Sequence, residues 1–169
     1  MLRDGMLGGM KTTTPSRPDW DTYFMSIAAV VASRGNCLRR KVAAVIVRDR
    51  QLISTGYNGT PRGIKNCCEG GCPRCAGEAP TGAQLTECIC SHAEENAITQ
   101  AAFHGIAVQG GTLYSTMSPC LMCAKMIINS GLREVVYEQE YEFGDQTKAL
   151  LHEAGVRYRR LGAGRMATR

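Results

Sequence analysis

Three residues with metal-binding side chains accompany one carboxylate near the middle of this 169-residue chain. His92 and Glu94 lie two positions apart, and Cys120 and Cys123 follow with two residues between them. An imidazole and two thiolates are zinc ligands, and three protein ligands leave the fourth tetrahedral position open for water, as in catalytic sites. Zinc lowers the pKa of such a water from its bulk value towards about 7. The pattern therefore predicts a catalytic zinc at His92, Cys120 and Cys123. Glu94 is expected to carry protons without binding the metal.

Two helices are expected to position these four side chains. The apolar spacing predicts one helix over residues 92–104 with Ser91 as its cap, and a second over 119–130 with Ser118 as its cap. The three ligands would then lie in the first turns of both helices. The positive ends of the helix dipoles favour the thiolate forms that metal binding requires.

The rest of the chain predicts an α/β fold with a five-stranded mixed sheet. Apolar periodicity and turn residues predict helices over 18–33 and 145–154, a hairpin of strands 42–47 and 52–57, and strands over 112–116, 134–137 and 156–161. Helices and strands alternate after residue 90, which predicts parallel crossover connections. The expected architecture has three layers, α/β/α, with helices on both faces of a sheet that is parallel apart from the opening hairpin.

Length and composition predict one domain over residues 18–161, with a cysteine-rich insert at 64–90. We expect a disordered tail at 1–17 and a basic tail at 162–169. The longest apolar runs are too short to cross a bilayer, and residues 1–14 lack the apolar centre of a signal peptide, so we expect a cytoplasmic protein without a membrane partner. Nine clustered cysteines, an odd number, indicate thiols and metal rather than disulfides.

The net charge of +5 is concentrated near the two ends of the chain, so the body between them is slightly acidic. A body of that charge argues against a nucleic-acid partner and suits a small anionic substrate. Arg34, Arg39, Arg40 and Lys41 form a local exception between the first expected helix and the first strand. Arginine forks bind phosphate through paired, charge-assisted hydrogen bonds. This loop is therefore a candidate phosphate site, and the alternative is a solvated basic turn.

Residues 18–161 resemble the deoxycytidylate (dCMP) deaminases, within the zinc-dependent cytidine/deoxycytidylate deaminase superfamily. The signature H-x-E followed by P-C-x-x-C, here at residues 92–94 and 119–123, is shared by zinc nucleobase deaminases. Residues 56–61, Gly-Tyr-Asn-Gly-Thr-Pro, narrow the resemblance to dCMP deaminases. It implies a cytidine-deaminase-like fold and hydrolysis of dCMP to dUMP and ammonia, which supplies dUMP for thymidylate synthesis. Zinc-bound hydroxide is expected to attack C4 while Glu94 shuttles protons.

The resemblance also implies a set of substrate-binding residues. They are Arg34, Arg39, Arg40, Asn58, Ala93, Ser118 and Tyr141. Arg34 is the first candidate for the 5′-phosphate, because it matches a family arginine at the same helix end, and Asn58 is expected to bond a deoxyribose hydroxyl. An enzyme built for this dianion should discriminate strongly against deoxycytidine.

The insert predicts a second, structural zinc. Cys72-Pro-Arg-Cys75 has the spacing of a zinc knuckle, and a metal would offset the entropy of ordering so long a loop. The resemblance implies a second zinc near this region and a matching position for Cys37. The candidate ligands are Cys37, Cys67, Cys72, Cys75 and Cys90, with Cys68 and Cys88 in reserve. The choice of four among them stays open.

The resemblance further implies a homo-hexamer that dCTP activates and dTTP inhibits, with Mg²⁺ accompanying the nucleotide effector. Two other functions remain as alternatives. A tRNA adenosine deaminase shares the zinc constellation but is expected to have a basic body and no cysteine-rich insert. A non-catalytic zinc-folded binding protein would have no need of Glu94.

Overall fold

The computed structural model describes residues 17–78, 80, 83–84, 87–141 and 144–162, so residues 1–16 and 163–169 of the two expected tails lie outside the described part. Its strands are β1 (Ala43–Arg48), β2 (Gln51–Tyr57), β3 (Thr112–Met117), β4 (Glu134–Gln139) and β5 (Arg157–Arg160). Its helices are α1 (Trp20–Ala32), α2 (Pro73–Ala76), α3 (Ala93–Phe103), α4 (Leu121–Asn129) and α5 (Asp145–Glu153), with a short 3₁₀ turn, η1 (Cys67–Glu69). None of these helices is long and apolar enough to span a membrane.

The five strands form one mixed sheet in the order β2-β1-β3-β4-β5, which confirms the predicted fold class. β3, β4 and β5 pair in parallel. β1 pairs antiparallel with both β2 and β3, so the antiparallel part extends one pairing beyond the predicted hairpin. The hairpin turns at Asp49 and Arg50, which both have positive φ, as a tight two-residue turn between twisted strands requires.

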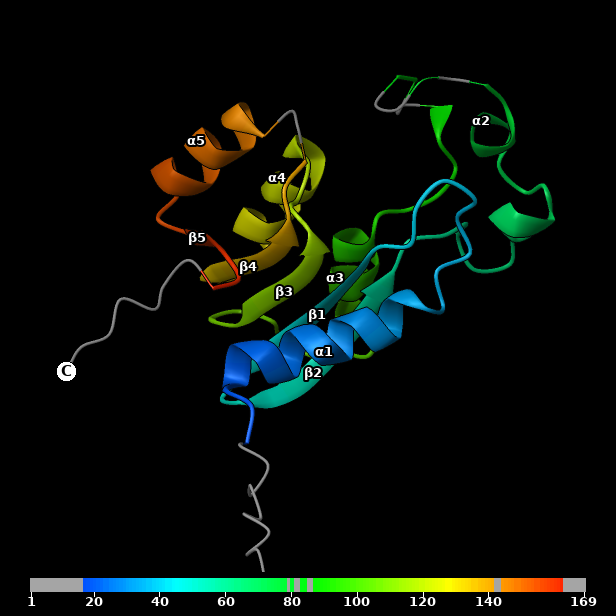
Figure 1. The fold of residues 1–169 in the computed structure, drawn as a ribbon. Coiled ribbons are helices and arrows are strands. Elements are labelled where there is room, and N and C mark those ends of the chain that lie inside the picture. The colour runs from blue at the N-terminus through cyan, green and yellow to red at the C-terminus, as the bar shows by residue number, and fades with distance from the viewer. Residues whose placement is uncertain (1–16, 79, 81–82, 85–86, 142–143, 163–169) are drawn as a thin grey trace, which may run out of the picture.

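Helices cover both faces of the sheet (Figure 1). β1 is buried along almost its whole length, and its side chains alternate between the two faces. Val45 and Val47 pack with residues of α1, whereas Ala44 and Ile46 belong to the core formed with α3, α4 and α5. This two-sided burial explains why β1 reads as an unbroken apolar run in the sequence.

α1 begins at Trp20, two residues after the predicted start at residue 18. Asp19 caps the helix by accepting a hydrogen bond from the Thr22 backbone N–H at 2.8 Å. Trp20 lies in the first turn of the helix and is 39% exposed. Its ring stacks on Phe24 and lies beneath the guanidinium of Arg50.

A buried carboxylate ties α1 to the far edge of the sheet. Glu134 on β4 accepts a hydrogen bond from Arg159 on β5 at 2.9 Å, and Arg159 also contacts Asp21 on α1 at 2.7 Å. The phenol of Tyr114 on β3 donates to Asp21 at 3.0 Å. The hydrogen bond from Arg159 lowers the pKa of Asp21.

We predict that Arg159→Ala lowers the free energy of unfolding by roughly 1–3 kcal/mol, because the mostly buried Glu134 loses a charged donor. Arg157→Ala is the matched control. Arg157 contacts the same carboxylate but is 69% exposed, so its loss should cost only about 0–1 kcal/mol. The lowered pKa of Asp21 adds stability that is present at neutral pH and is lost as the pH falls below about 4. Urea titrations at pH 7 and pH 3 measure both effects. Equal losses in the free energy of unfolding for the two variants at pH 7 would contradict the larger role given to Arg159.

Candidate active site

The first residues of α3 and α4 carry the predicted metal ligands. His92 and Cys120 are themselves the N-caps of these helices, both in extended conformation, so the predicted caps Ser91 and Ser118 are each wrong. Glu95 fixes the start of α3, because its carboxylate accepts hydrogen bonds from the His92 backbone N–H at 3.1 Å and from the Ser91 hydroxyl at 3.3 Å.

The three ligand atoms converge between the two helix starts. His92 Nδ1 lies 3.4 Å from Cys120 Sγ and 3.4 Å from Cys123 Sγ. With Zn–N of about 2.0–2.1 Å and Zn–S of about 2.3 Å, the nitrogen–sulfur edge of a tetrahedral site is about 3.6 Å long. The donor set and its spacing therefore fit a zinc ion, as the sequence predicts.

Hydrogen bonding prepares one of these thiols for a metal. A hydrogen bond from the neighbouring Cys123 thiol, together with a hydrogen bond from the His92 ring, lowers the pKa of Cys120 to about 4. The same contact and burial raise the pKa of Cys123. The Cys120 thiolate in turn raises the pKa of His92 to about 9. The lowered pKa favours the thiolate form of Cys120, which is the form that binds metal.

Glu94 lies beside this group and is only 4% exposed. The Cys123 Sγ lies 3.7 Å from Glu94 Oε2, and burial raises the pKa of the carboxyl group. A buried carboxyl next to three candidate metal ligands is suited to hold and transfer protons.

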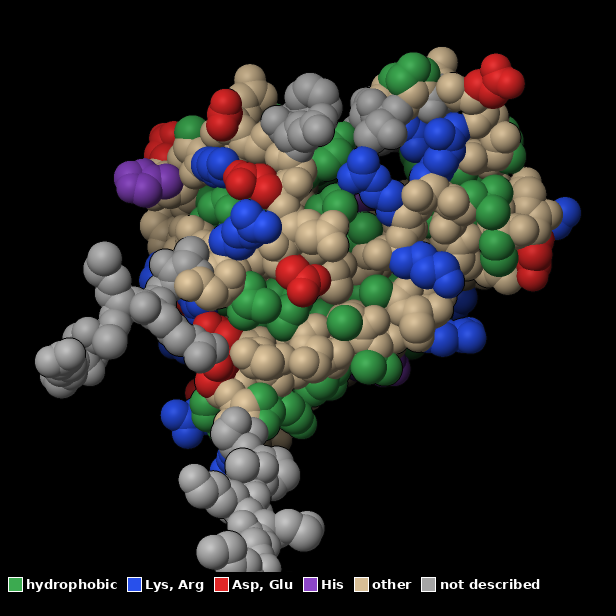
Figure 2. All heavy atoms as spheres, in the orientation of Figure 1, with side chains coloured by type: hydrophobic (Ala, Val, Ile, Leu, Met, Phe, Trp, Pro, Cys, Tyr) green, Lys and Arg blue, Asp and Glu red, His purple; other side chains and the backbone are tan. Residues whose placement is uncertain are grey.

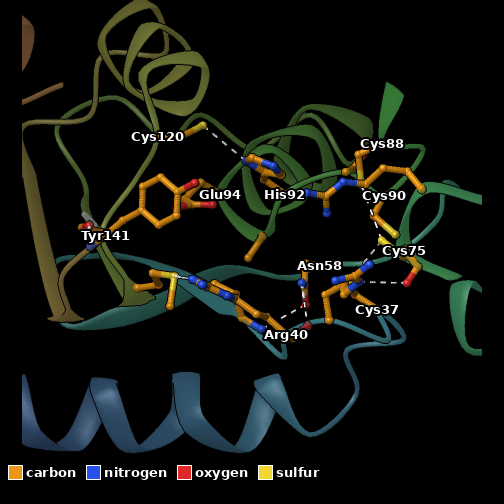
Figure 3. Close-up of a pocket in the computed structure, with 17 residues that line it drawn as sticks. Cys37, Arg40, Asn58, Cys75, Cys88, Cys90, His92, Glu94, Cys120 and Tyr141 are labelled. Carbon is orange, nitrogen blue, oxygen red and sulfur yellow. Dashed lines mark hydrogen bonds between the residues drawn. The ribbon is translucent and has the colours of Figure 1, made fainter. Parts of the chain in front are cut away.

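A cavity leads from these residues towards the insert (Figure 3). Its wall includes most of the residues that the sequence predicts for catalysis and substrate binding. They are Arg39, Arg40, Asn58, His92, Ala93, Glu94, Ser118, Cys120 and Tyr141. Arg74 of α2 and four cysteines, Cys37, Cys75, Cys88 and Cys90, line it at the insert. Figure 2 shows basic side chains gathered around a hollow between the insert and the body of the protein.

Asn58 is buried and bridges two chain segments at the floor of this cavity. Its Oδ1 accepts a hydrogen bond from the Val42 backbone N–H at 3.0 Å, and its Nδ2 donates to the Arg40 carbonyl at 2.8 Å. An amide group has two acceptor lone pairs and two donor hydrogens, so each end keeps the capacity for one further bond. Ser118 accepts a hydrogen bond from the Tyr141 backbone N–H at 2.7 Å, which places that tyrosine at the opposite wall.

The arginines of the cavity differ from the predicted set. Arg34, the first candidate, is exposed at the end of α1 and is not among the described residues that line the cavity. Arg39 lines it, and its Nε donates to the Cys75 carbonyl at 2.9 Å. Arg40 lies over the ring of Tyr141, 5.8 Å from its centre. Arg74, which sequence reasoning missed, lies between the two cysteines of the predicted knuckle and donates to the Ala83 carbonyl at 2.8 Å.

The insert brings six cysteine side chains together. All five predicted ligands, Cys37, Cys67, Cys72, Cys75 and Cys90, lie in this cluster, and the reserve candidate Cys88 joins them. Cys68, the other reserve candidate, is exposed and lies outside it. Burial and the neighbouring sulfurs raise the pKa of Cys75 and of Cys90.

A family model described as the cytidine and deoxycytidylate deaminase zinc-binding region matches residues 18–139. The deoxycytidylate deaminase of Schizosaccharomyces pombe is 47% identical over 143 residues, which cover 85% of this chain and 44% of that protein. The deoxycytidylate deaminase of Mycobacterium phage D29 is 43% identical over 130 residues, which cover 74% of this chain and 98% of the phage protein. The chain therefore spans less than half of the fission yeast relative and nearly all of the phage relative.

Among solved structures, the dCMP deaminase of cyanophage S-TIM5 in complex with dCMP and dUMP aligns with a TM-score of 0.71. The two sequences are 32% identical, and the alignment covers 86% of this chain and 98% of the cyanophage chain.

Proposed function

Because the chain belongs to the cytidine and deoxycytidylate deaminase family, we propose that it hydrolyses dCMP to dUMP and ammonia. One observation carries this proposal. A single cavity has a three-ligand metal site with a buried carboxyl at one end and arginines at the other. A pyrimidine ring with a 5′-phosphate on its sugar matches that arrangement of chemical groups.

His92, Cys120 and Cys123 would hold the zinc, which when bound would activate a water for attack on the ring carbon that carries the amino group. Glu94 accepts one proton from the attacking water and delivers it to the ring nitrogen, and it then carries the second proton of that water to the amine, which leaves as ammonia. Ala93 lies in the first turn of α3, where a backbone N–H has no partner within the helix. Ala93 lines the cavity together with Glu94, and we therefore assign its N–H to the ring carbonyl oxygen.

The other end of the cavity is assigned to the sugar and the phosphate. The remaining donor and acceptor of Asn58 suit a deoxyribose hydroxyl. The guanidinium group of Arg39 is held by the carbonyls of Cys75 and Gly77, and that of Arg74 by the carbonyls of Pro80 and Ala83. The Nη1 group of each arginine makes none of these bonds, so we assign it to the phosphate. Arg40 is the third candidate, placed by its contact with Tyr141.

The remaining expectations stay predictions. They include the structural zinc in the insert, the domain limits at residues 18 and 161, the homo-hexamer and the cytoplasmic location. They also include activation by dCTP, inhibition by dTTP, the binding of Mg²⁺ together with the effector, and the supply of dUMP for thymidylate synthesis. Of these, the structural zinc has support from the geometry, because the predicted cysteines converge.

The proposed substrate is tested by measuring ammonia release from a panel of dCMP, CMP, deoxycytidine, dCTP and a tRNA anticodon stem-loop. The expected result is that dCMP has the highest kcat/KM of the panel. Preferential release from the stem-loop would instead assign the chain to the tRNA deaminases. Release from none of them, by protein that holds zinc at its catalytic site, would indicate a binding protein.

A further inference from the structure

The six clustered cysteines form two overlapping groups of four. One group consists of Cys37, Cys67, Cys75 and Cys90, and the other of Cys72, Cys75, Cys88 and Cys90. Within each group all four sulfur atoms lie within 4.8 Å of one another. Cys75 and Cys90 belong to both groups, so the two groups share one edge.

The sulfur separations match those around a tetrahedral metal ion. A Zn–S bond of about 2.3 Å gives a sulfur–sulfur edge of about 3.8 Å. Cys75 Sγ lies 3.7 Å from Cys37 Sγ and 3.7 Å from Cys88 Sγ, and Cys72 Sγ lies 3.9 Å from Cys88 Sγ. A disulfide bond would require about 2.05 Å. The cysteines are therefore spaced as metal ligands and not as bonded pairs.

A single ion would leave two of these sulfurs without a metal. Cys67 and Cys72 are both fully buried, and each belongs to only one of the two groups. A zinc ion bound only by the first group would leave the buried Cys72 without a metal, and an ion bound only by the second group would leave the buried Cys67 without one. The backbone N–H of Leu38 donates to Cys67 Sγ at 3.4 Å, a contact of the kind that orients metal-bound thiolates.

We infer that the six cysteines hold two zinc ions in one binuclear cluster, in which Cys75 and Cys90 bridge the ions. Together with the zinc of the proposed catalytic site, each chain would bind three zinc ions. Cys37 and Cys67 complete the ligands of one ion, and Cys72 and Cys88 those of the other. This goes beyond the single structural zinc expected from the sequence, and it holds whatever the substrate is.

The cluster also builds one end of the cavity. Cys75 supplies the carbonyl that holds Arg39, and Arg74 lies between Cys72 and Cys75 on α2. Cys90 lies two residues before the candidate metal ligand His92, and both residues line the cavity (Figure 3). If the proposed function is correct, loss of one cluster ion should displace the phosphate-binding arginines without removing the catalytic metal.

Metal stoichiometry tests the inference without reference to activity. We expect native mass spectrometry and elemental analysis of the full chain, purified without chelator, to give three zinc ions per chain. A stable count of two would contradict the binuclear cluster and leave one structural ion. Cys72→Ser and Cys88→Ser should each lose one ion, whereas Cys68→Ser, a matched change at an exposed cysteine outside the cluster, should lose none.

Bridging is tested directly in the unmutated protein, so a failure of the variants to fold does not decide the matter. After exchange with ¹¹³Cd, the β-protons of Cys75 and Cys90 should each correlate with two cadmium nuclei in a proton–cadmium spectrum. Those of the other four cysteines should correlate with one. Correlation of every cysteine with a single cadmium nucleus would overturn the shared-edge arrangement, even if three ions were present.

The effect on the cavity is measured separately. Cys88→Ser should raise the KM for dCMP by roughly tenfold or more, the usual scale for losing support around a functional site. Cys68→Ser should leave it unchanged. If the Cys88→Ser protein has lost one zinc ion but its KM for dCMP is unchanged, the cluster does not support phosphate binding. The proposal that the cluster holds two zinc ions would still stand.

Discussion

Glu94→Gln is expected to lower kcat for dCMP by roughly 10²–10⁴-fold while the protein keeps its catalytic zinc. Glutamine has almost the same shape as glutamate but cannot accept and return a proton. His92, Cys120 and Cys123 are the proposed metal ligands, and the group of three does not include the carboxyl group of Glu94. The measurement is steady-state ammonia release, combined with zinc analysis of the same preparation.

Two further variants make this result specific. Cys123→Ser should lose catalytic zinc and activity together, because it removes one of the three ligands. Glu95→Gln is the neighbouring control and should keep most of the activity, since glutamine can still accept the hydrogen bond from the His92 backbone. A Glu94→Gln enzyme with normal turnover would contradict the assignment of the proton carrier.

The second large effect concerns the choice of substrate. We expect kcat/KM for dCMP to exceed that for deoxycytidine by about 10²-fold or more, because each charge-assisted hydrogen bond to the phosphate is worth roughly 1.5–3 kcal/mol. Without the phosphate, the guanidinium groups of Arg39 and Arg74 would face the cavity without their anionic partner. Arg39→Ala and Arg74→Ala should therefore narrow the gap between the two substrates.

Arg34→Ala is the matched control for this experiment. Arg34 is exposed and does not line the cavity among the described residues, so its loss should leave the ratio unchanged. A narrowed ratio for Arg34→Ala alone would instead return the phosphate role to the residue that the sequence favoured. Equal rates with dCMP and deoxycytidine in the unmutated enzyme would refute phosphate recognition altogether.

The fold and the group of candidate metal ligands could be predicted because both depend on short-range patterns. Apolar spacing identified the helices and strands, and ligand spacing identified His92, Cys120 and Cys123. The helix caps were missed by one or two residues because the metal ligands themselves occupy the cap positions, a role that histidine and cysteine seldom have. Ser118, the expected cap, binds the Tyr141 backbone instead.

The phosphate site and the cysteine cluster could not be derived in the same way. Arg39 is placed by the carbonyl of Cys75, which lies far along the chain, and Arg74 reaches the cavity only because the insert folds back over it. Likewise, the spacing of Cys72 and Cys75 indicates a metal knuckle but carries no information on which sulfurs two metal sites share. Contacts between distant segments decide these points.

The proposed reaction is tested most directly by incubating the purified, zinc-containing protein with dCMP in H₂¹⁸O and analysing the products by mass spectrometry. The expected result is dUMP that carries one ¹⁸O atom on its ring, with one ammonia released for each dUMP formed. Unchanged dCMP, or dUMP whose new oxygen does not come from water, would contradict hydrolytic deamination at this site.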